Sequence, residues 1–227
     1  MTSVRLTADS LDLRDGDLAL RVLGRSAGRA RVGVLAGRML LLGGDEVELD
    51  VEVEAGCRLD LVEIAGTVAH HGRGRSAAWR SRVRVGADAV LTWAAEPFVV
   101  SDGADVVRSL DVEMSAGSRA VVREVLVLGR SGQGGGALRS RTRVRLDGAP
   151  LHVEDLDLRD AGLRASPAVL GAARVVDTLS CWGFRDDGDP LALQLEGPGT
   201  VERYLGRDHH ESPLSRRWAP LCAAASA

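Results

Sequence analysis

The chain has 227 residues, 45% of them hydrophobic, which is enough for one domain with a sizeable core. A net charge of -3 and an aromatic content of 3% argue against a nucleic-acid binder, which would be basic and would need aromatic side chains for base stacking. No stretch approaches about 18 uninterrupted apolar residues and no signal peptide is recognisable at the N-terminus, so we expect no membrane span and a cytoplasmic location.

Strands with one apolar face are the main expectation for the first two thirds of the chain. The segment Asp45 to Gly56 reads DEVELDVEVEAG, in which apolar residues alternate with carboxylates. Alternation with a period of two is typical of a half-buried strand. Similar segments occur at Arg80 to Gly86, Leu110 to Gly117 and Arg139 to Gly148.

Turn glycines give these strands a regular period. Gly56, Gly86, Gly117 and Gly148 end the four segments at spacings of 30, 31 and 31 residues, and a second apolar run follows each glycine. Gly24 is a candidate end for a degenerate first copy. Such a period predicts a mainly β, solenoid-like stack of antiparallel hairpins. An ordinary β-sandwich with evenly spaced hairpins fits the pattern equally well.

The exposed faces of the four strands alternate in sign. The first (Glu46 to Glu54) and third (Asp111, Glu113) are acidic, whereas the second (Arg80 to Arg84) and fourth (Arg139 to Arg145) are basic. Opposite charges on neighbouring strands stabilise their pairing. We therefore hypothesise complementary charge ladders between consecutive units. Independently solvated faces are the alternative.

The last third of the chain differs in character. Ser166 and Pro167 suit a helix N-terminus, which predicts a helix over Ala168 to Leu179. Val201 to Leu205 fits a second short helix or a strand, and the polar segment Gly183 to Pro190 is expected to be a loop. With about two short helices in this third and no long linker, we expect a single domain over residues 1–227.

Three elements stand out in the region from Gly37 to Leu158. They are Leu42-Gly43-Gly44-Asp45 with the strand that follows, Val85 to Leu91 followed by Glu96-Pro97-Phe98, and Arg123 to Arg130. In their order and spacing they together resemble the UreD family of urease accessory proteins, although the stretch Glu63 to His70 departs from the family's pattern.

The resemblance implies a cytoplasmic scaffold that is not an enzyme. Family members are partners of UreF, UreG and apo-urease, and they provide an internal passage for nickel in transit without a permanently bound cofactor. The motif residues that it implies as partner-binding or structural are Gly44, Asp45, Glu96, Pro97, Gly129 and Arg130. A β-solenoid binding or scaffold module unrelated to metal is the alternative.

Nickel in transit needs ligands that bind it weakly and release it again. Carboxylates and imidazoles are therefore the candidates for contact with nickel. For the adjacent pair His70-His71, a surface role is the alternative. Glu124 stands in an apolar run and therefore either faces a polar interior or pairs with an arginine of the next strand. The candidate residues are Glu63, His70, His71, Glu124 and His152.

Motifs of common enzymes are missing from the chain. There is no GxSxG, no HExxH and no dinucleotide-binding fingerprint. The glycine-rich run from Gly129 to Gly136 lacks the Lys-Ser/Thr of a P-loop, so a flexible hairpin loop explains it better. We therefore expect no catalytic residues.

Overall fold

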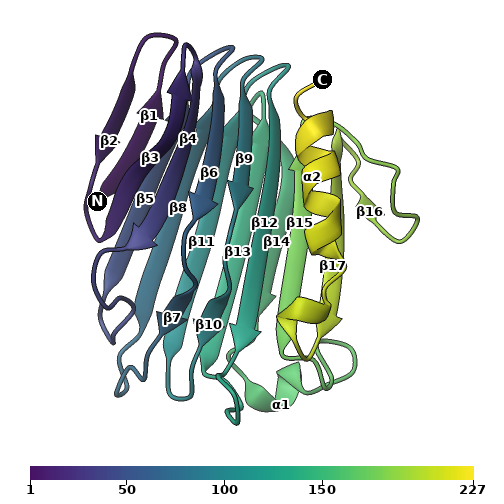
Figure 1. Cartoon of the computed structure of the whole chain (residues 1–227). Helices are drawn as coiled ribbons and strands as arrows, with labels where there is room; N and C mark the ends of the chain where they lie inside the picture. The colour runs from purple at the N-terminus through teal and green to yellow at the C-terminus, as the bar shows by residue number, and fades with distance from the viewer.

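A computed structural model describes residues 1–227 and forms a sandwich of two β-sheets (Figure 1). Sheet A has seven strands, in the order β14 (Ala149–Asp157), β13 (Ala137–Leu146), β11 (Asp105–Met114), β8 (Ala77–Val85), β5 (Glu46–Val53), β1 (Thr2–Leu6) and β2 (Leu11–Arg14). The main path of sheet B runs β16 (Leu193–Gln194), β17 (Gly199–Gly206), β15 (Val175–Trp182), β12 (Arg119–Leu128), β9 (Val90–Ala94), β6 (Arg58–Glu63), β4 (Arg29–Ala36) and β3 (Leu18–Ser26). Two short strands, β7 (Thr67–Ala69) and β10 (Phe98–Val100), pair with each other, and β10 also pairs with β12.

The predicted solenoid is confirmed. Each central unit places one strand in sheet A, reverses direction at a turn, and places its second strand in sheet B. Strands β5, β8, β11 and β13 are parallel neighbours in sheet A, and β4, β6, β9 and β12 are parallel neighbours in sheet B.

One detail differs from the expected stack of hairpins. The two strands of a central unit face each other across the core instead of hydrogen-bonding to each other, because both edges of each strand already pair with the neighbouring units. Hydrogen-bonded antiparallel hairpins occur towards the two ends of the stack, as in β1–β2, β3–β4 and β13–β14. Facing strands of this kind bury one apolar face of each sheet against the other.

Glycines shape the turns between the sheets. Gly56 and Gly117 have φ angles of 68° and 71°, a region that side chains with a Cβ disfavour. In the first unit Gly28, with φ 64°, makes the hairpin turn between β3 and β4 within sheet B. The expectation that Gly24 ends the first copy is therefore wrong, since Gly24 lies within β3 at an irregularity in its pairing with β4.

The core lies between the sheets and follows the alternation of the strands. In β5, the inward residues Val47, Leu49, Val51 and Val53 are at most 2% exposed. They belong to one cluster of 41 buried residues that both sheets share. Trp93, Phe98 and Trp182 are also buried in it. The apolar half of each alternating strand therefore supplies the core that the composition led us to expect.

The charge ladders are present on the outer face of sheet A. Strand β8 supplies the arginines and β5 the carboxylates, in pairs that register opposite or diagonally across the strands. The ion pairs are Arg80–Glu46 at 3.0 Å, Arg82–Glu48 and Arg82–Asp50 at 3.2 Å, and Arg84–Glu52 at 3.6 Å. Further along the sheet, Arg143 of β13 pairs with Asp111 of β11 at 3.9 Å. The faces of β5 and β8 are therefore paired with each other and not independently solvated, whereas between β8 and β11 opposite charges stand in register without an ion pair.

The helix expected over Ala168 to Leu179 is wrong, because Val175–Trp182 form strand β15. This strand is buried on both faces, with the core on one side and a helix on the other, and its β-branched residues favour an extended chain there. Val201 to Leu205 lie in strand β17, and Gly183 to Pro190 have no regular structure.

The two short α-helices expected in the last third are α1 (Ala161–Arg164) and α2 (Leu214–Ala224), and a 3-10 turn, η1 (His209–Glu211), precedes α2. Asp160 caps α1 by accepting from the amide of Leu163. Helix α2 packs on β12, β15 and β17 of sheet B (Figure 1). Neither helix has the length and apolar character needed to cross a membrane.

Reversing the acidic column of β5 tests the ladder. The double substitution Glu48→Arg with Glu52→Arg puts like charges opposite Arg80 and Arg84, and we expect the free energy of unfolding to fall by about 1–2 kcal/mol. Urea unfolding at low salt measures this loss, which should shrink in about 1 M salt. Asp187→Arg, in an exposed loop outside the ladder, is the control. An unchanged stability of the double variant at low salt would refute the ladder.

Candidate functional site

Polar side chains interrupt the apolar core along one line between the sheets. They project inward from six strands. The set begins on β6 and ends at the edge of the sandwich where β14 and β17 meet. We call this set the interior polar row; it consists of Glu63, Arg108, Glu124, His152, Glu154, Thr178 and Arg203.

Glu63 ends β6 and has its carboxylate enclosed by the core. Trp93 Nε1 donates to Glu63 Oε1 at 3.3 Å, and the backbone N–H of Glu96 donates to Glu63 Oε2 at 3.2 Å. Burial raises the pKa of Glu63 to about 7, although the positive charge of Arg108 and the two hydrogen bonds act in the opposite direction. At neutral pH this carboxyl group therefore exchanges a proton easily.

Arg108 of β11 and Glu124 of β12 form an ion pair across the space between the two sheets. Their side chains are only 8% and 15% exposed. The Arg108 guanidinium also lies 5.5 Å from the centre of the Phe98 ring, and its Nε has no hydrogen-bond partner. Both sequence alternatives for Glu124 therefore hold in part, since it faces the interior and pairs with an arginine, but that arginine belongs to the opposite sheet.

The row reaches the surface at the edge of the sandwich. Arg203 of β17 binds both carboxylate oxygens of Glu154 of β14 at 2.7 and 2.8 Å, and its Nε donates to Thr178 Oγ1 at 3.1 Å. Arg203 and Glu154 side chains are each 29% exposed. This pair therefore separates the rest of the row from solvent.

His152 lies beside that edge, and its side chain makes no hydrogen bond within the chain. Its Nδ1 is buried without a hydrogen-bond partner, and its ring centre is 6.0 Å from that of Trp182. Burial lowers the pKa of His152, which keeps the imidazole neutral. A neutral imidazole with a free nitrogen lone pair is the form that binds a metal ion.

The two other candidate histidines lie elsewhere, in the loop after β7. His70 is half-buried, and its Nδ1 is 3.5 Å from Arg130 Nη2. His71 is exposed, and its Nδ1 accepts from the backbone N–H of Arg73 at 3.0 Å. The structure therefore brings Glu63, Glu124 and His152 into one interior row and leaves the histidine pair outside it.

The motif residues organise loops at the end of the sandwich where His70 and His71 lie. Asp45 accepts from the backbone N–H of Leu42 at 3.1 Å, which closes the turn that contains Gly44. The N–H of Gly129 donates to Val100 O at 2.8 Å, and that of Arg130 to Gln133 Oε1 at 3.0 Å.

Glu96 and Pro97 precede β10. The carbonyl of Pro97 accepts from Thr67 N at 3.0 Å, while the amide of Glu96 binds Glu63 as described above. The side chain of Glu96 points to solvent, since the residue is exposed. The contacts of the motif residues are thus structural ones within the chain.

No group of three or more His, Cys, Asp and Glu side chains comes close enough together to hold a metal ion. Glu63, Glu124 and His152 share a row, but they do not form a closed coordination shell. Whether any of them contacts nickel stays a prediction.

Sequence reasoning missed four members of the row: Arg108, Glu154, Thr178 and Arg203. Arg108 has a signal, because it occupies an inward position between Val106 and Leu110 in an alternating strand. Arg203 and Glu154 have none, because their contact joins strands 49 residues apart whose pairing no local pattern reveals.

Titration of Glu63 predicts how stability depends on pH. Between about pH 4.5 and 7 the folded chain keeps a proton on Glu63 that the unfolded chain releases, so this group makes the free energy of unfolding fall as pH rises through that window. Glu63→Gln should flatten the curve there. Urea unfolding at a series of pH values measures this, with the exposed neighbour Glu96→Gln as control. Parallel curves for wild type and Glu63→Gln would contradict the assignment.

Breaking the Arg108–Glu124 pair should be more costly than removing it. Glu124→Leu leaves the Arg108 charge buried without a partner, and we expect a loss of about 3 kcal/mol or more in the free energy of unfolding. The double substitution Arg108→Met with Glu124→Leu removes both charges and should recover most of that loss. Chemical denaturation of wild type, Glu124→Leu and the double variant measures these differences. A double variant no more stable than Glu124→Leu would argue against this pairing.

Comparison with known proteins agrees with this architecture. Residues 40–210 match the model of the UreD urease accessory protein family. Urease accessory protein UreD 1 of Streptomyces griseus is 45% identical over 207 residues, which cover 90% of this chain and 80% of that protein. Urease accessory protein UreD 1 of Saccharopolyspora erythraea is 39% identical over 195 residues, covering 82% and 76% of the two chains. The chain belongs to the UreD family of urease accessory proteins.

Proposed function

We propose that the chain is a nickel-insertion chaperone for urease, acting in the cytoplasm as a scaffold between apo-urease and the UreF/UreG complex, and that it is not an enzyme. Membership of the UreD family supports a role in urease maturation. The nickel role draws its support from one observation, the interior polar row, because a core of this kind has no structural need for so many ionisable groups.

The charge balance in the row favours the binding of a cation. Glu63 and Glu124 contribute two carboxylates, and Arg108 is the positive charge next to both. With both carboxylates ionised the group carries one excess negative charge, which a proton on Glu63 removes. A metal ion that binds the Glu63 carboxylate displaces this proton, which dissociates readily at neutral pH.

The ligand set suits transit better than storage. A closed site of three or four ligands would hold the ion, whereas single oxygen or nitrogen ligands along a path release it again. Glu63, Glu124 and the free Nδ1 of His152 provide such single ligands. Nickel is the cargo in this proposal, with no resident metal.

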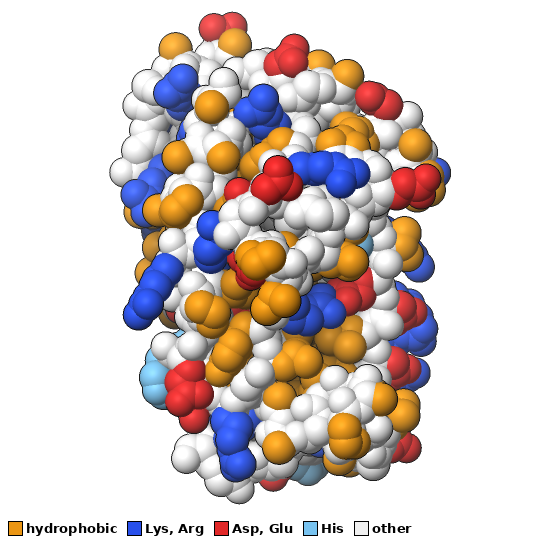
Figure 2. Space-filling model, turned by 90° about the vertical axis from the view of Figure 1, so that its right-hand side faces the viewer, with side chains coloured by type: hydrophobic (Ala, Val, Ile, Leu, Met, Phe, Trp, Pro, Cys, Tyr) orange, Lys and Arg blue, Asp and Glu red, His pale blue; other side chains and the backbone are white.

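Apolar side chains at the β16 and β17 end of the sandwich support a partner surface. Leu191, Leu193 and Leu205 are 91%, 63% and 45% exposed, and Val153 of β14 is 67% exposed. Figure 2 looks onto this end and shows hydrophobic side chains spread among charged ones. Non-obligate protein interfaces have a mixed apolar and polar composition of this kind. The Arg203–Glu154 edge of the row lies between the same strands, so a partner bound there would stand next to the row.

A scaffold that does not handle metal is the second candidate, and the missing three-ligand cluster favours it. Such a scaffold would hold the maturation complex together without contact between its interior and nickel. The interior residues then would affect stability alone.

Deleting the gene tests the proposal. We expect urease purified from the deletion strain to contain little nickel and to regain it when the wild-type gene is restored, as measured by elemental analysis of the purified enzyme. His152→Leu, at a buried nitrogen that binds nothing in the chain, should lower the nickel content while the amount of chain in the cell stays unchanged. Restoration with His210→Leu, in the exposed turn η1, is the control outside the row.

Normal nickel loading in the deletion strain would overturn the role in maturation. Loss of nickel in the deletion strain, together with full loading by variants at both His152 and Glu63, would instead favour the scaffold without metal contact.

A further inference from the structure

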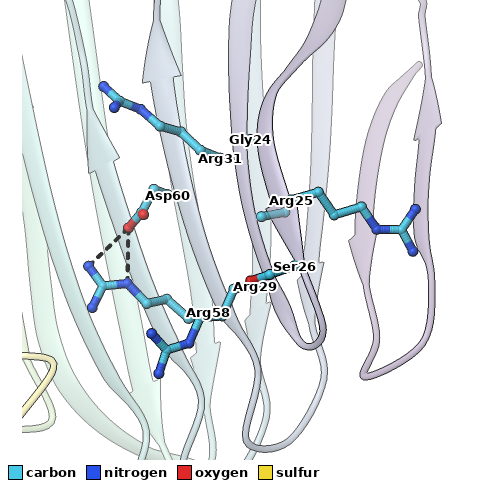
Figure 3. Close-up of a pocket in the computed structure, with 8 residues that line it drawn as sticks. Gly24, Arg25, Ser26, Arg29, Arg31, Arg58 and Asp60 are labelled. Atoms are coloured by element: carbon cyan, nitrogen blue, oxygen red, sulfur yellow. Dashed lines mark hydrogen bonds and ion pairs between the residues drawn. The ribbon is translucent and has the colours of Figure 1, made fainter.

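The outer face of sheet B has a basic hollow at its N-terminal end, facing away from the core and from the interior polar row. The hollow measures about 380 Å³ and lies over strands β3, β4 and β6 (Figure 3). Four arginines and a single carboxylate line it, together with small residues. The lining consists of Gly24, Arg25, Ser26, Arg29, Ala30, Arg31, Arg58 and Asp60.

Two arginines of this hollow, Arg29 and Arg31, lack the pairing found on sheet A. Arg58 pairs with Asp60 and also donates to Ser226 Oγ, and Arg25 donates to the carbonyl oxygen of Asp9. Asp60 is already engaged, since it accepts from Arg58 at 3.3 Å and from Thr92 Oγ1 at 2.8 Å. The side chains of Arg29 and Arg31 take part in none of the ion pairs or hydrogen bonds of the chain. The site therefore keeps at least two unneutralised positive charges on a protein whose net charge is -3.

The register between β4 and β6 places two of the hollow's positive charges opposite each other, which destabilises the pairing of the strands. Arg29 of β4 stands directly opposite Arg58 of β6, and Figure 3 shows their side chains lying close to each other. Like charges directly opposite each other on neighbouring strands destabilise a sheet. On sheet A the equivalent positions in β5 and β8 carry opposite charges, such as Asp50 and Arg82. An anion placed between Arg29 and Arg58 would remove the repulsion.

Open space over the sheet leaves room for such a ligand. Gly24 stands opposite Arg31 on β3, and a Cβ built there would meet nothing within 4 Å. The hydroxyl of Ser26, opposite Arg29, makes no hydrogen bond within the chain. Arg25 points away from the others, towards the edge of the sheet, and Arg31 extends away from Arg29 and Arg58, beyond Asp60, so Arg29 and Arg58 are the two arginines whose side chains lie together (Figure 3).

An apolar spot continues this surface along the same strands. Gly33 follows Arg29 and Arg31 on the outer face of β4, and the side chains of Leu23 and Ile64 close over it. Leu23 and Ile64 are nevertheless 49% and 50% exposed. Helix α2 covers β12, β15 and β17 and leaves this part of the sheet bare (Figure 1).

We propose that the surface formed by Arg29, Arg31, Arg58, Leu23 and Ile64 binds an acidic segment of a partner protein. Guanidinium groups bind carboxylates through paired, charge-assisted hydrogen bonds. Alternate residues of β4 are about 6.6 Å apart, the same repeat as that of alternate side chains in an extended peptide. A segment with two acidic residues and one apolar residue at alternate positions therefore fits the two arginines and the apolar spot. No aromatic residue lines the hollow, so it offers no platform for a nucleotide base.

The probe is a fluorescein-labelled peptide with the central sequence Glu-Ser-Glu-Ser-Leu between glycines, and fluorescence anisotropy with the full chain measures its Kd. We expect saturable binding that weakens with salt. Arg29→Glu combined with Arg31→Glu should raise Kd by about tenfold or more, and Ile64→Ser should raise it severalfold. Arg14→Glu, on exposed strand β2, is the matched control and should leave Kd within about twofold.

A stability measurement separates loss of the site from loss of the fold. Arg29→Glu alone should weaken peptide binding and yet raise the melting temperature, because it replaces a like-charge pair with an attractive one opposite Arg58. Absence of peptide binding up to about 1 mM, or equal binding by the double arginine variant, would overturn the proposal. It would also fail if inorganic phosphate displaced the peptide at lower concentration and Ile64→Ser had no effect, since the hollow would then be a site for small anions.

Discussion

Each central strand lies in register beside the strand of the next repeat unit, so that Asp50 stands next to Arg82 and Arg82 next to Asp111. Identical units stacked in this way would align identical charges along the whole sheet, and each strand would repel the next. Alternating the sign of the outward residues from unit to unit turns the same geometry into a source of attraction. The parallel stack thus dictates the charge pattern of the exposed strands as much as it dictates their apolar faces.

The same stacking determines what a polar residue costs inside. An inward charge cannot escape to solvent, because strands flank it on both sides and the opposite sheet covers it. Glu124 therefore depends on Arg108 from the facing sheet, and Glu63 relieves its own burial by holding a proton more tightly. These groups contribute little net stability for the desolvation they require. Their presence is easier to explain by a task that needs exchangeable charge within the core, which is the basis of the proposed role in nickel transit.

Local patterns in the sequence were enough for the period, the turns after the strands and the mainly β class. They failed where tertiary contacts decide. Val175–Trp182 follow a good helix start, yet α2 and the core cover both faces and make this segment a central strand. Of the row, Glu63, Glu124 and His152 were among the candidates because of their residue types. Arg203 and Glu154 were not, because only the closure of the sandwich edge brings β14 and β17 together.

The arginines of β8 are paired with carboxylates on the outer face of sheet A, whereas those of β4 on the outer face of sheet B are not, and this difference bears on function. On sheet A the arginines of β8 all pair with carboxylates of β5, so that face is electrostatically satisfied and offers a partner little gain. On sheet B, Arg29 faces Arg58 and has no carboxylate partner of its own, beside half-exposed Leu23 and Ile64. A surface that is destabilising in the isolated chain gains the most when a complementary partner covers it. For the proposed scaffold, the face with the unpaired arginine is therefore the one suited to binding, and the ladder face is the one that holds the stack together.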